Sequence, residues 1–179
     1  MMMVQNNMIP ITIDLHHQWI GMWNLGEKVV HALPSPKSDE VFILNLSDNQ
    51  ITDGDISTLM SIIESYNLKP HLQILDLSNN RLTLEGAKEL IPLLRTEQLR
   101  WLDISINNLG VSDLQELWSE IETQAQIAAI LEDLTLPVEE IRDQWATKVI
   151  LLPGNYTIER FPLSPPFVNG HNQYYKLTN

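Results

Sequence analysis

The chain has no cysteine, few basic residues and few glycines. Without cysteine among its 179 residues, disulfides, thiolate metal ligands and cysteine nucleophiles are excluded. The seven glycines form no glycine-rich loop of the kind that cradles phosphates. No run of about 18 apolar residues is present, so we expect no membrane-spanning helix and no insertion into a membrane.

The scarcity of positive charge limits the partners. The 11 lysines and arginines face 23 acidic residues, which gives a net charge of −12. Such a chain repels phosphate backbones and anionic lipids, so we expect no nucleic-acid partner, whereas a protein with a basic surface patch is attracted. The stretch from Met1 to Pro10 has neither the basic start nor the apolar core of a secretory signal, which predicts a cytoplasmic location.

Three segments of the chain superimpose on the pattern L-x-x-L-x-L-x-x-N-x-L. They begin at Val41, Leu72 and Leu99 and contain the stretches "LNLSDNQIT", "LDLSNNRLT" and "LDISINNLG". Alternating leucines predict a short strand that buries one face. The asparagine that follows each strand predicts a buried amide that pairs with backbone groups of the turn, and these residues are Asn49, Asn80 and Asn107.

These stretches resemble leucine-rich repeats, and their period resembles the ribonuclease-inhibitor-like subtype, which has a helix in each repeat. The resemblance implies an α/β fold: a short right-handed solenoid with a parallel β-sheet on the concave face and helices on the convex face. The small lone array also resembles the short leucine-rich-repeat effectors of intracellular bacterial pathogens. For a delivered effector, the location would be the host cytosol instead of the bacterial cytoplasm.

Helical spacing of apolar residues follows each predicted strand. The candidate N-cap residues are Thr52 or Asp53, Thr83 and Ser112. Pro92 is expected to kink or shorten the second helix. A long helix is expected over residues 112–133, and a further helix is expected to begin near Pro137.

We expect one domain over residues 1–179. Residues 1–40 are predicted to form a degenerate first repeat, with Gln18 in place of the asparagine and a helix over about residues 19–33. Three clear repeats occupy residues 41–118. A helical cap with a last strand, containing Ile150 in its core position, is expected over residues 119–160, followed by an irregular tail over 161–179.

Stacked strands align their outward residues into columns about 5 Å apart. The predicted partner-binding residues in these columns are Ile43, Ile74, Trp101, Asp14, Asn45, Asp76, Asp103, His16, Ser78 and Ser105. The same register places Val149 beside Trp101. Tryptophan beside aliphatic residues is typical of an interface, although Trp101 could instead be covered by a terminal helix. On the neighbouring column, Asp76 and Asp103 could bind an arginine or lysine.

The leading functional prediction is a monomeric, non-enzymatic protein–protein interaction module without cofactor or metal. One form of it is an inhibitor whose concave sheet covers the active site of a partner enzyme. A second form is an adaptor that bridges two proteins, with its acidic helical end as the second surface. Two other classes are a fragment that self-associates through its edges and a hydrolase that uses Asp14, His16 and Ser47. Neighbouring His16 and His17 are expected on opposite faces of a strand, which prevents joint metal binding.

Overall fold

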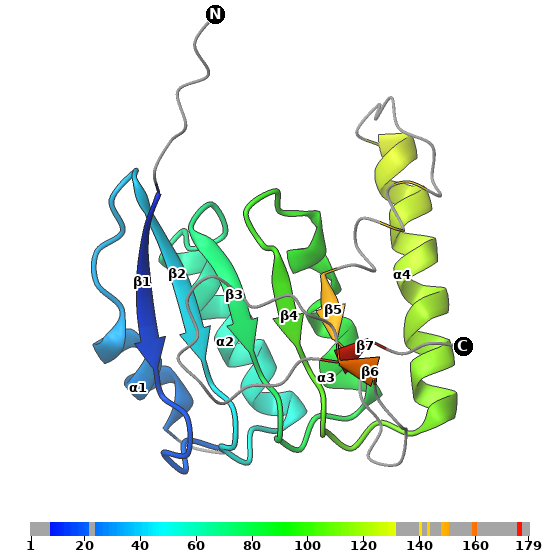
Figure 1. The fold of residues 1–179 in the computed structure, drawn as a ribbon, viewed down its shortest axis with the longest axis horizontal. Helices are drawn as coiled ribbons and strands as arrows, with labels where there is room; N and C mark the ends of the chain where they lie inside the picture. Colours follow the sequence, from blue (N-terminus) through cyan, green and yellow to red (C-terminus); the bar gives the residue numbers. More distant parts are fainter. Residues whose placement is uncertain are drawn as a thin grey trace, which may run out of the picture.

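The computed structural model describes residues 8–21, 24–131, 140, 143, 148–150, 159–160 and 175–176. Five parallel strands form one sheet in chain order, namely β1 (Ile9–Asp14), β2 (Glu40–Asn45), β3 (Leu72–Asp76), β4 (Trp101–Asp103) and β5 (Val149–Ile150). The intervening α-helices are α1 (Leu25–Ala32), α2 (Asp53–Ser65), α3 (Leu84–Glu89) and α4 (Val111–Leu131) (Figure 1). A separate antiparallel pair consists of β6 (Glu159–Arg160) and β7 (Tyr175–Lys176).

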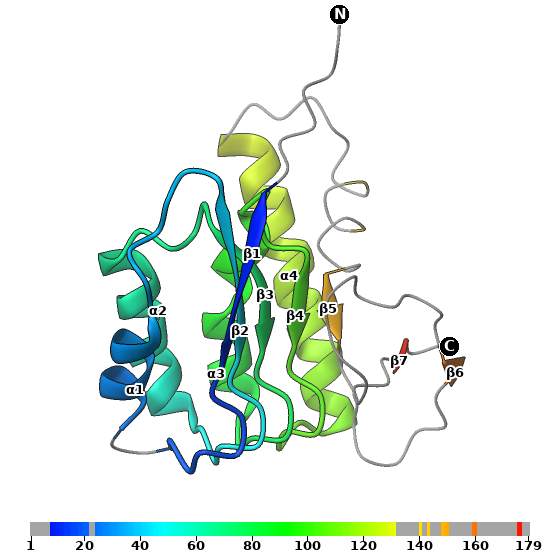
Figure 2. The same ribbon diagram turned by 60° about the vertical axis from the view of Figure 1, so that its left-hand side comes forward.

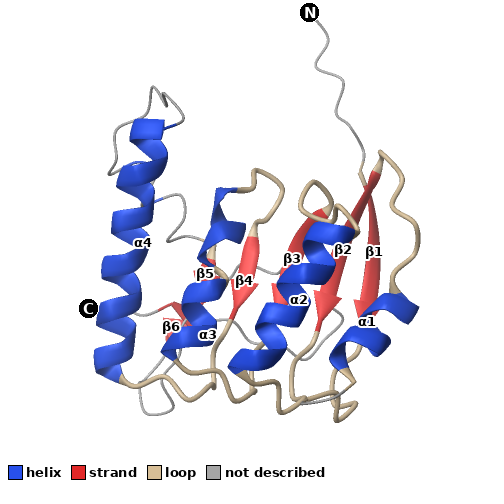
Figure 3. Ribbon diagram, turned by 180° about the vertical axis from the view of Figure 1, so that it is seen from behind, coloured by secondary structure: helices blue, strands red, loops and turns tan. Residues whose placement is uncertain are grey.

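The four α-helices lie on one side of the five-stranded sheet. Figure 2 shows the sheet from an oblique direction with the helices on one side, and Figure 3 shows the helices in front of the strands. This layering follows from the parallel pairing, because a parallel connection must cross from one end of the sheet to the other. The predicted α/β class and parallel sheet are confirmed, while the right-handed sense of the array remains a prediction. We call the side away from these helices the sheet face.

The alternating leucines fill the space between sheet and helices. Leu44, Leu75 and Leu102 are each 2% exposed or less and belong to one continuous core cluster. Ile56 and Leu59 of α2 are fully buried in the same cluster. The strand period of two and the helical spacing therefore converge on one core, as the repeat pattern predicts.

The repeat asparagines join each turn to the next. Asn80 Oδ1 accepts hydrogen bonds from the N–H groups of Asn49 and Ile51, at 3.0 and 2.9 Å, and its Nδ2 donates to the Leu46 carbonyl at 3.0 Å. In the same way, Asn49 Oδ1 accepts from the N–H of Gln18 at 2.8 Å. The asparagines are thus structural, as predicted, and the turn that follows β1 docks through the same kind of contact.

The helix starts follow the predicted capping residues in two of three cases. Thr52 precedes α2 and forms a capping box with Asp55, and Thr83 precedes α3. Ser112 is not an N-cap, because α4 begins at Val111 and the Asp113 carboxylate accepts a hydrogen bond from the Gly110 N–H at 2.8 Å.

Pro92 shortens the second repeat's helix as predicted. The α-helix α3 stops at Glu89, and a 3₁₀ helix over Ile91–Arg95 follows with the proline in its first turn. Proline lacks the N–H that an α-helix would need at this position, so the tighter turn replaces it.

The N-terminal repeat departs from the prediction in its helix and its turn. The helix α1 begins at Leu25 instead of Trp19, because Trp19 has a left-handed φ of 55° that no α-helix contains. Strand β1 ends at Asp14, so His16 and His17 lie in the following turn and not on two faces of a strand.

The last strand pairs in a register one residue away from the predicted one. Leu102 pairs with Val149 and Asp103 with Ile150, whereas the sequence pattern placed Val149 beside Trp101. A two-residue strand carries too short a pattern to fix its register. The helix expected near Pro137 and most of the tail fall outside the described residues, although Tyr175–Lys176 of the tail forms β7.

Candidate binding surface

The strand register assembles the predicted apolar column on the sheet face. Ile43 pairs with Ile74, and Ile74 with Trp101. None of these three side chains belongs to the core cluster beneath the sheet, since strand residues alternate between the two faces. Ile74 and Trp101 are half-buried, whereas Ile43 is only 5% exposed, contrary to the expectation that the whole column is open to solvent.

A polar column runs beside the apolar one. The register places Asp14 beside Asn45, Asn45 beside Asp76, and Asp76 beside Asp103. In each repeat the side-chain oxygen accepts a hydrogen bond from the residue two positions later. The N–H of Ser78 donates to Asp76 at 2.9 Å and the N–H of Ser105 donates to Asp103 at 2.9 Å. This local turn fixes the direction of every side chain in the column.

Asp76 and Asp103 are buried, which corrects the prediction of an exposed acidic ridge. Their exposed fractions are 6% and 5%, and Ser105 is also buried at 5%. Both carboxylates lie on inner strands with a neighbouring strand about 5 Å away on each side, whereas Asp14, which makes the same contact to its own chain on the edge strand β1, stays exposed. The solvent-exposed polar groups of the face include Thr12, Asp14 and His16, while Asn45, Ser47 and Ser78 are half-buried.

Burial changes the titration of both aspartates. Loss of solvation, followed by repulsion from Asp76, raises the pKa of Asp103 to about 7. Burial is likewise the largest cause that raises the pKa of Asp76, while hydrogen bonds from Ser78 oppose the shift. The pair therefore holds a proton more readily than ordinary aspartates do, and its charge near neutrality depends on pH.

The predicted hydrolase residues do not assemble into a nucleophilic site. His16 Nδ1 lies 2.8 Å from Asp14 Oδ1, so the expected acid–base pair forms. The Ser47 hydroxyl, however, donates to Asn45 Oδ1 at 2.7 Å, which is a contact of the repeat turn. A serine nucleophile needs its hydroxyl directed to a base, and here it is directed to an amide oxygen.

A surface that the sequence analysis missed lies along the turns that follow the strands. His17, Asp48, Asn79 and Ile106 occupy equivalent positions, and all four have left-handed φ angles between 52° and 56°. His17 Nδ1 lies 2.6 Å from Asp48 Oδ2, and Asn79 Nδ2 donates to Asp48 Oδ1 at 3.0 Å. We call these four residues, together with Trp19, the turn ridge. The sequence signal that could have revealed this surface is Ile106, an isoleucine at a position where the other repeats have a polar residue.

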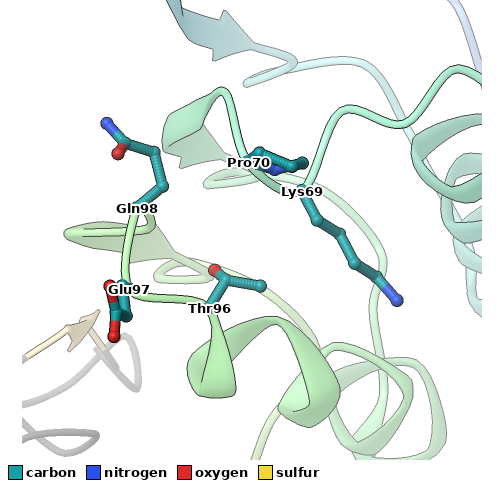
Figure 4. Close-up of a pocket in the computed structure, with 5 residues that line it drawn as sticks. All are labelled: Lys69, Pro70, Thr96, Glu97 and Gln98. Atoms are coloured by element: carbon teal, nitrogen blue, oxygen red, sulfur yellow. The ribbon is translucent and has the colours of Figure 1, made fainter.

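A pocket of about 340 Å³ lies at the opposite end of the strands. It is lined by Lys69, Pro70, Thr96, Glu97 and Gln98, from the loops before β3 and β4 (Figure 4). Lys69 Nζ pairs with Glu64 at 2.5 Å and the Thr96 hydroxyl donates to the Leu93 carbonyl at 2.8 Å. Two of its polar groups therefore serve the surrounding loops.

The described part of the chain contains neither a metal-binding cluster nor a membrane-spanning helix. Within it, no group of three or more His, Asp, Glu or Cys side chains is arranged to hold a metal ion. Among the same residues, no helix is both long and apolar enough to cross a membrane.

Comparison with known proteins identifies the repeat. Residues 43–60 and 69–90 each match the family model described as leucine rich repeat. No curated protein matches the chain. The matched segments cover β2 with the start of α2, and β3 with α3, so each spans a strand, an asparagine turn and a helix. The two matches and this geometry support a leucine-rich-repeat protein.

Proposed function

We propose that the chain binds a partner protein through its sheet face. Leucine-rich repeats generally mediate protein–protein interaction, and stacked repeats offer an extended surface for it. The observation that carries the proposal is the column formed by Ile43, Ile74 and Trp101, which lies outside the core cluster. Half-buried tryptophan beside isoleucine offers a large apolar contact that loses little side-chain entropy on binding.

The polar column beside it favours a basic partner. Asp14 keeps 50% of its side chain exposed at the first strand, and Asn45 and Ser78 add half-buried polar groups. The buried aspartates add negative potential only where they are ionised, because burial raises the pKa of both. Together with a net charge of −12, these groups attract a positively charged patch and orient it on the apolar column. When the partner is an enzyme whose active site meets this column, binding makes the chain an inhibitor.

Catalysis is the weaker alternative. The Asp14–His16 contact supplies a base, but the Ser47 hydroxyl is directed to Asn45. An adaptor needs a second binding surface in addition to the sheet face, and the acidic helical end is the one that the sequence suggests.

Quantitative affinity capture with variants of the sheet face tests the proposal. The double variant Ile74→Ser, Trp101→Ala removes the exposed part of the apolar column. The matched control Ile127→Ala removes an apolar side chain, 37% exposed, from α4. We expect the double variant to lose at least about tenfold in affinity for a captured partner, which corresponds to about 1.4 kcal/mol, and the control to keep it. Equal retention by both variants, with unchanged thermal melts, would contradict the proposal.

A further inference from the structure

The turn ridge contains two large apolar residues in a backbone conformation that disfavours them. Ile106 has φ 53° and is 57% exposed, and Trp19 has φ 55° and is 68% exposed. A β-branched residue with positive φ is a genuine outlier, because its Cβ meets the following carbonyl. Asparagine and aspartate tolerate this region, and they occupy the equivalent positions 79 and 48.

Folding does not explain these two residues. Both side chains lie outside the core cluster, so they contribute little to packing. A polar residue or glycine at position 106 would relieve the strain and remove an exposed apolar surface. Strain that persists without a gain in packing is characteristic of functional positions, and loops commonly carry such positions.

The two apolar residues stand at opposite ends of a polar network. The Trp19 ring meets the His17 ring edge-on with centroids 6.0 Å apart, and His17 contacts Asp48. Asp48 keeps 48% of its side chain exposed, although both carboxylate oxygens already have partners. An aromatic ring and a carboxylate on either side of one histidine form a place that attracts a cation.

We propose that the turn ridge binds an extended segment of a partner protein that carries an arginine or lysine at the β1–β2 end and an aliphatic residue at the β4 end. The cation meets Trp19 and Asp48, and the aliphatic side chain covers Ile106. The exposed cation Arg81 follows β3 and repels a second basic residue there, which fixes the orientation of the segment.

Strand spacing sets the distance between the two anchors. Three steps of about 4.8 Å separate the β1 turn from the β4 turn, or about 14 Å. An extended chain rises about 3.3 Å per residue, so the basic and the aliphatic residue are about four positions apart. This surface lies at the ends of the strands and is separate from the sheet face, so it would give the chain a second protein-binding site.

Selection from a phage library of random 12-residue peptides tests the inference on the full chain. We expect enriched peptides to share a basic and an aliphatic residue about four positions apart. A synthetic peptide with the enriched sequence should lose at least tenfold in affinity for the variants Trp19→Ala and Ile106→Asn, at about 1.4 kcal/mol per tenfold. The control Tyr66→Ala removes another exposed aromatic ring, 44% exposed, and should bind as the wild type does.

A change of charge makes the test specific. The variant Asp48→Lys should reject the basic peptide and bind better to a peptide with glutamate in place of the basic residue. The sheet-face variant Ile74→Ser, Trp101→Ala should keep the affinity, which separates this inference from the proposed function. Failure to enrich any peptide would overturn the inference. So would enriched peptides without a basic residue, or peptides that bind the Trp19 and Ile106 variants as tightly as the wild type.

Discussion

At the scale of the residue, Asn80, like Asn49, has a buried amide that makes five hydrogen bonds to the backbone. It is 7% exposed, accepts from two N–H groups of the preceding repeat and donates to three carbonyls. A buried amide with every hydrogen bond satisfied stabilises the turn, while its removal leaves several backbone groups without partners.

The substitution Asn80→Ala should lower the free energy of unfolding by at least about 3 kcal/mol, because more than one buried backbone group loses its partner. Its neighbour supplies the control. Asn79 is exposed with a left-handed φ of 53°, which glycine adopts freely, so Asn79→Gly should change stability by less than about 1 kcal/mol. Chemical denaturation measures both, and equal losses would show that the buried amide has no special role.

For Ile106 we expect the opposite effect, a gain in stability when the residue is replaced. The substitution Ile106→Asn should raise the free energy of unfolding by about 0.5–1 kcal/mol, because asparagine tolerates the left-handed region that strains isoleucine. Thermal melts of the wild type and the variant measure this difference in stability. Destabilisation would mean that packing of the isoleucine outweighs its strain, and the case for a functional role of this residue would then fail.

The buried aspartate pair predicts a pH dependence of stability. The pKa of Asp103 is about 7 in the fold, whereas an unfolded aspartate titrates near 3.9. The folded chain therefore holds the proton more tightly between about pH 4 and 7, and this group's contribution to stability decreases as the pH rises through that window. Above about pH 7 the contribution is constant.

The substitution Asp103→Asn should remove this decrease and stabilise the chain at pH 8 by about 1–3 kcal/mol relative to the wild type. Denaturation at a series of pH values measures the effect. The control Asp39→Asn changes an exposed aspartate of the turn before β2 and should leave the profile between pH 5 and 8 unchanged in shape. A wild-type profile that rises between pH 5 and 7 would contradict the burial of the pair.

At the scale of the element, the repeats pack so closely that a single methyl group matters. A Cβ at Gly21 would overlap the backbone carbonyl of Gln50, with the carbonyl carbon 2.7 Å away. At Gly86, in α3, a Cβ would overlap the Asp53 carboxylate. The first obstacle is backbone held by the neighbouring repeat, while the second is a side chain that can rotate away.

The substitution Gly21→Ala should therefore cost about 1–3 kcal/mol, because the first repeat must separate from the second. Gly86→Ala should change stability by less than about 1 kcal/mol, since the gain in helix propensity offsets the displaced side chain. Thermal melts of the two variants compare them directly. The Asp53 carboxylate accepts hydrogen bonds from the Thr83 N–H at 2.9 Å and the Thr83 hydroxyl at 2.6 Å, and a larger loss at Gly86 would show that these bonds matter more than the backbone contact at Gly21.

The sequence predicts elements best where the pattern repeats. Three matching segments locate β2, β3 and β4, whereas the degenerate first repeat over residues 1–40 remains a prediction, although the Gln18 N–H donates to Asn49. The predicted start of α1 was wrong because the spacing of hydrophobic residues does not reveal which turn residues have left-handed backbone angles. The register of β5 was wrong because two residues carry almost no periodic signal.

The candidate site was harder to predict than the fold. The register correctly aligned the apolar and polar columns, since parallel pairing follows from the repeat. The exposure of these columns did not follow from the register, because Asp14 and Asp76 occupy the same repeat position and make the same local contact, yet only Asp76 is buried. The turn ridge was missed because its signal is a backbone angle at each turn.

At the scale of the whole molecule, the layering determines which surfaces can bind. The described helices cover one side of the sheet (Figure 2). The apolar column with Trp101 lies outside the core cluster between sheet and helices, and therefore on the other side. The edge strand β1 contains Pro10, which lacks the N–H that pairing with another strand needs. Size-exclusion chromatography with light scattering should accordingly show a monomer over a wide concentration range, and a dimer that forms on concentration would contradict this.

Photo-crosslinking tests the central claim, that the sheet face binds a partner protein, most directly. A photoreactive phenylalanine analogue replaces Trp101 in one variant and Ile127 of α4 in another, and each variant is irradiated with the captured partner. We predict covalent adducts from position 101 and none from position 127, because only the first lies on the sheet face. Adducts from position 127 with none from position 101 would contradict the account.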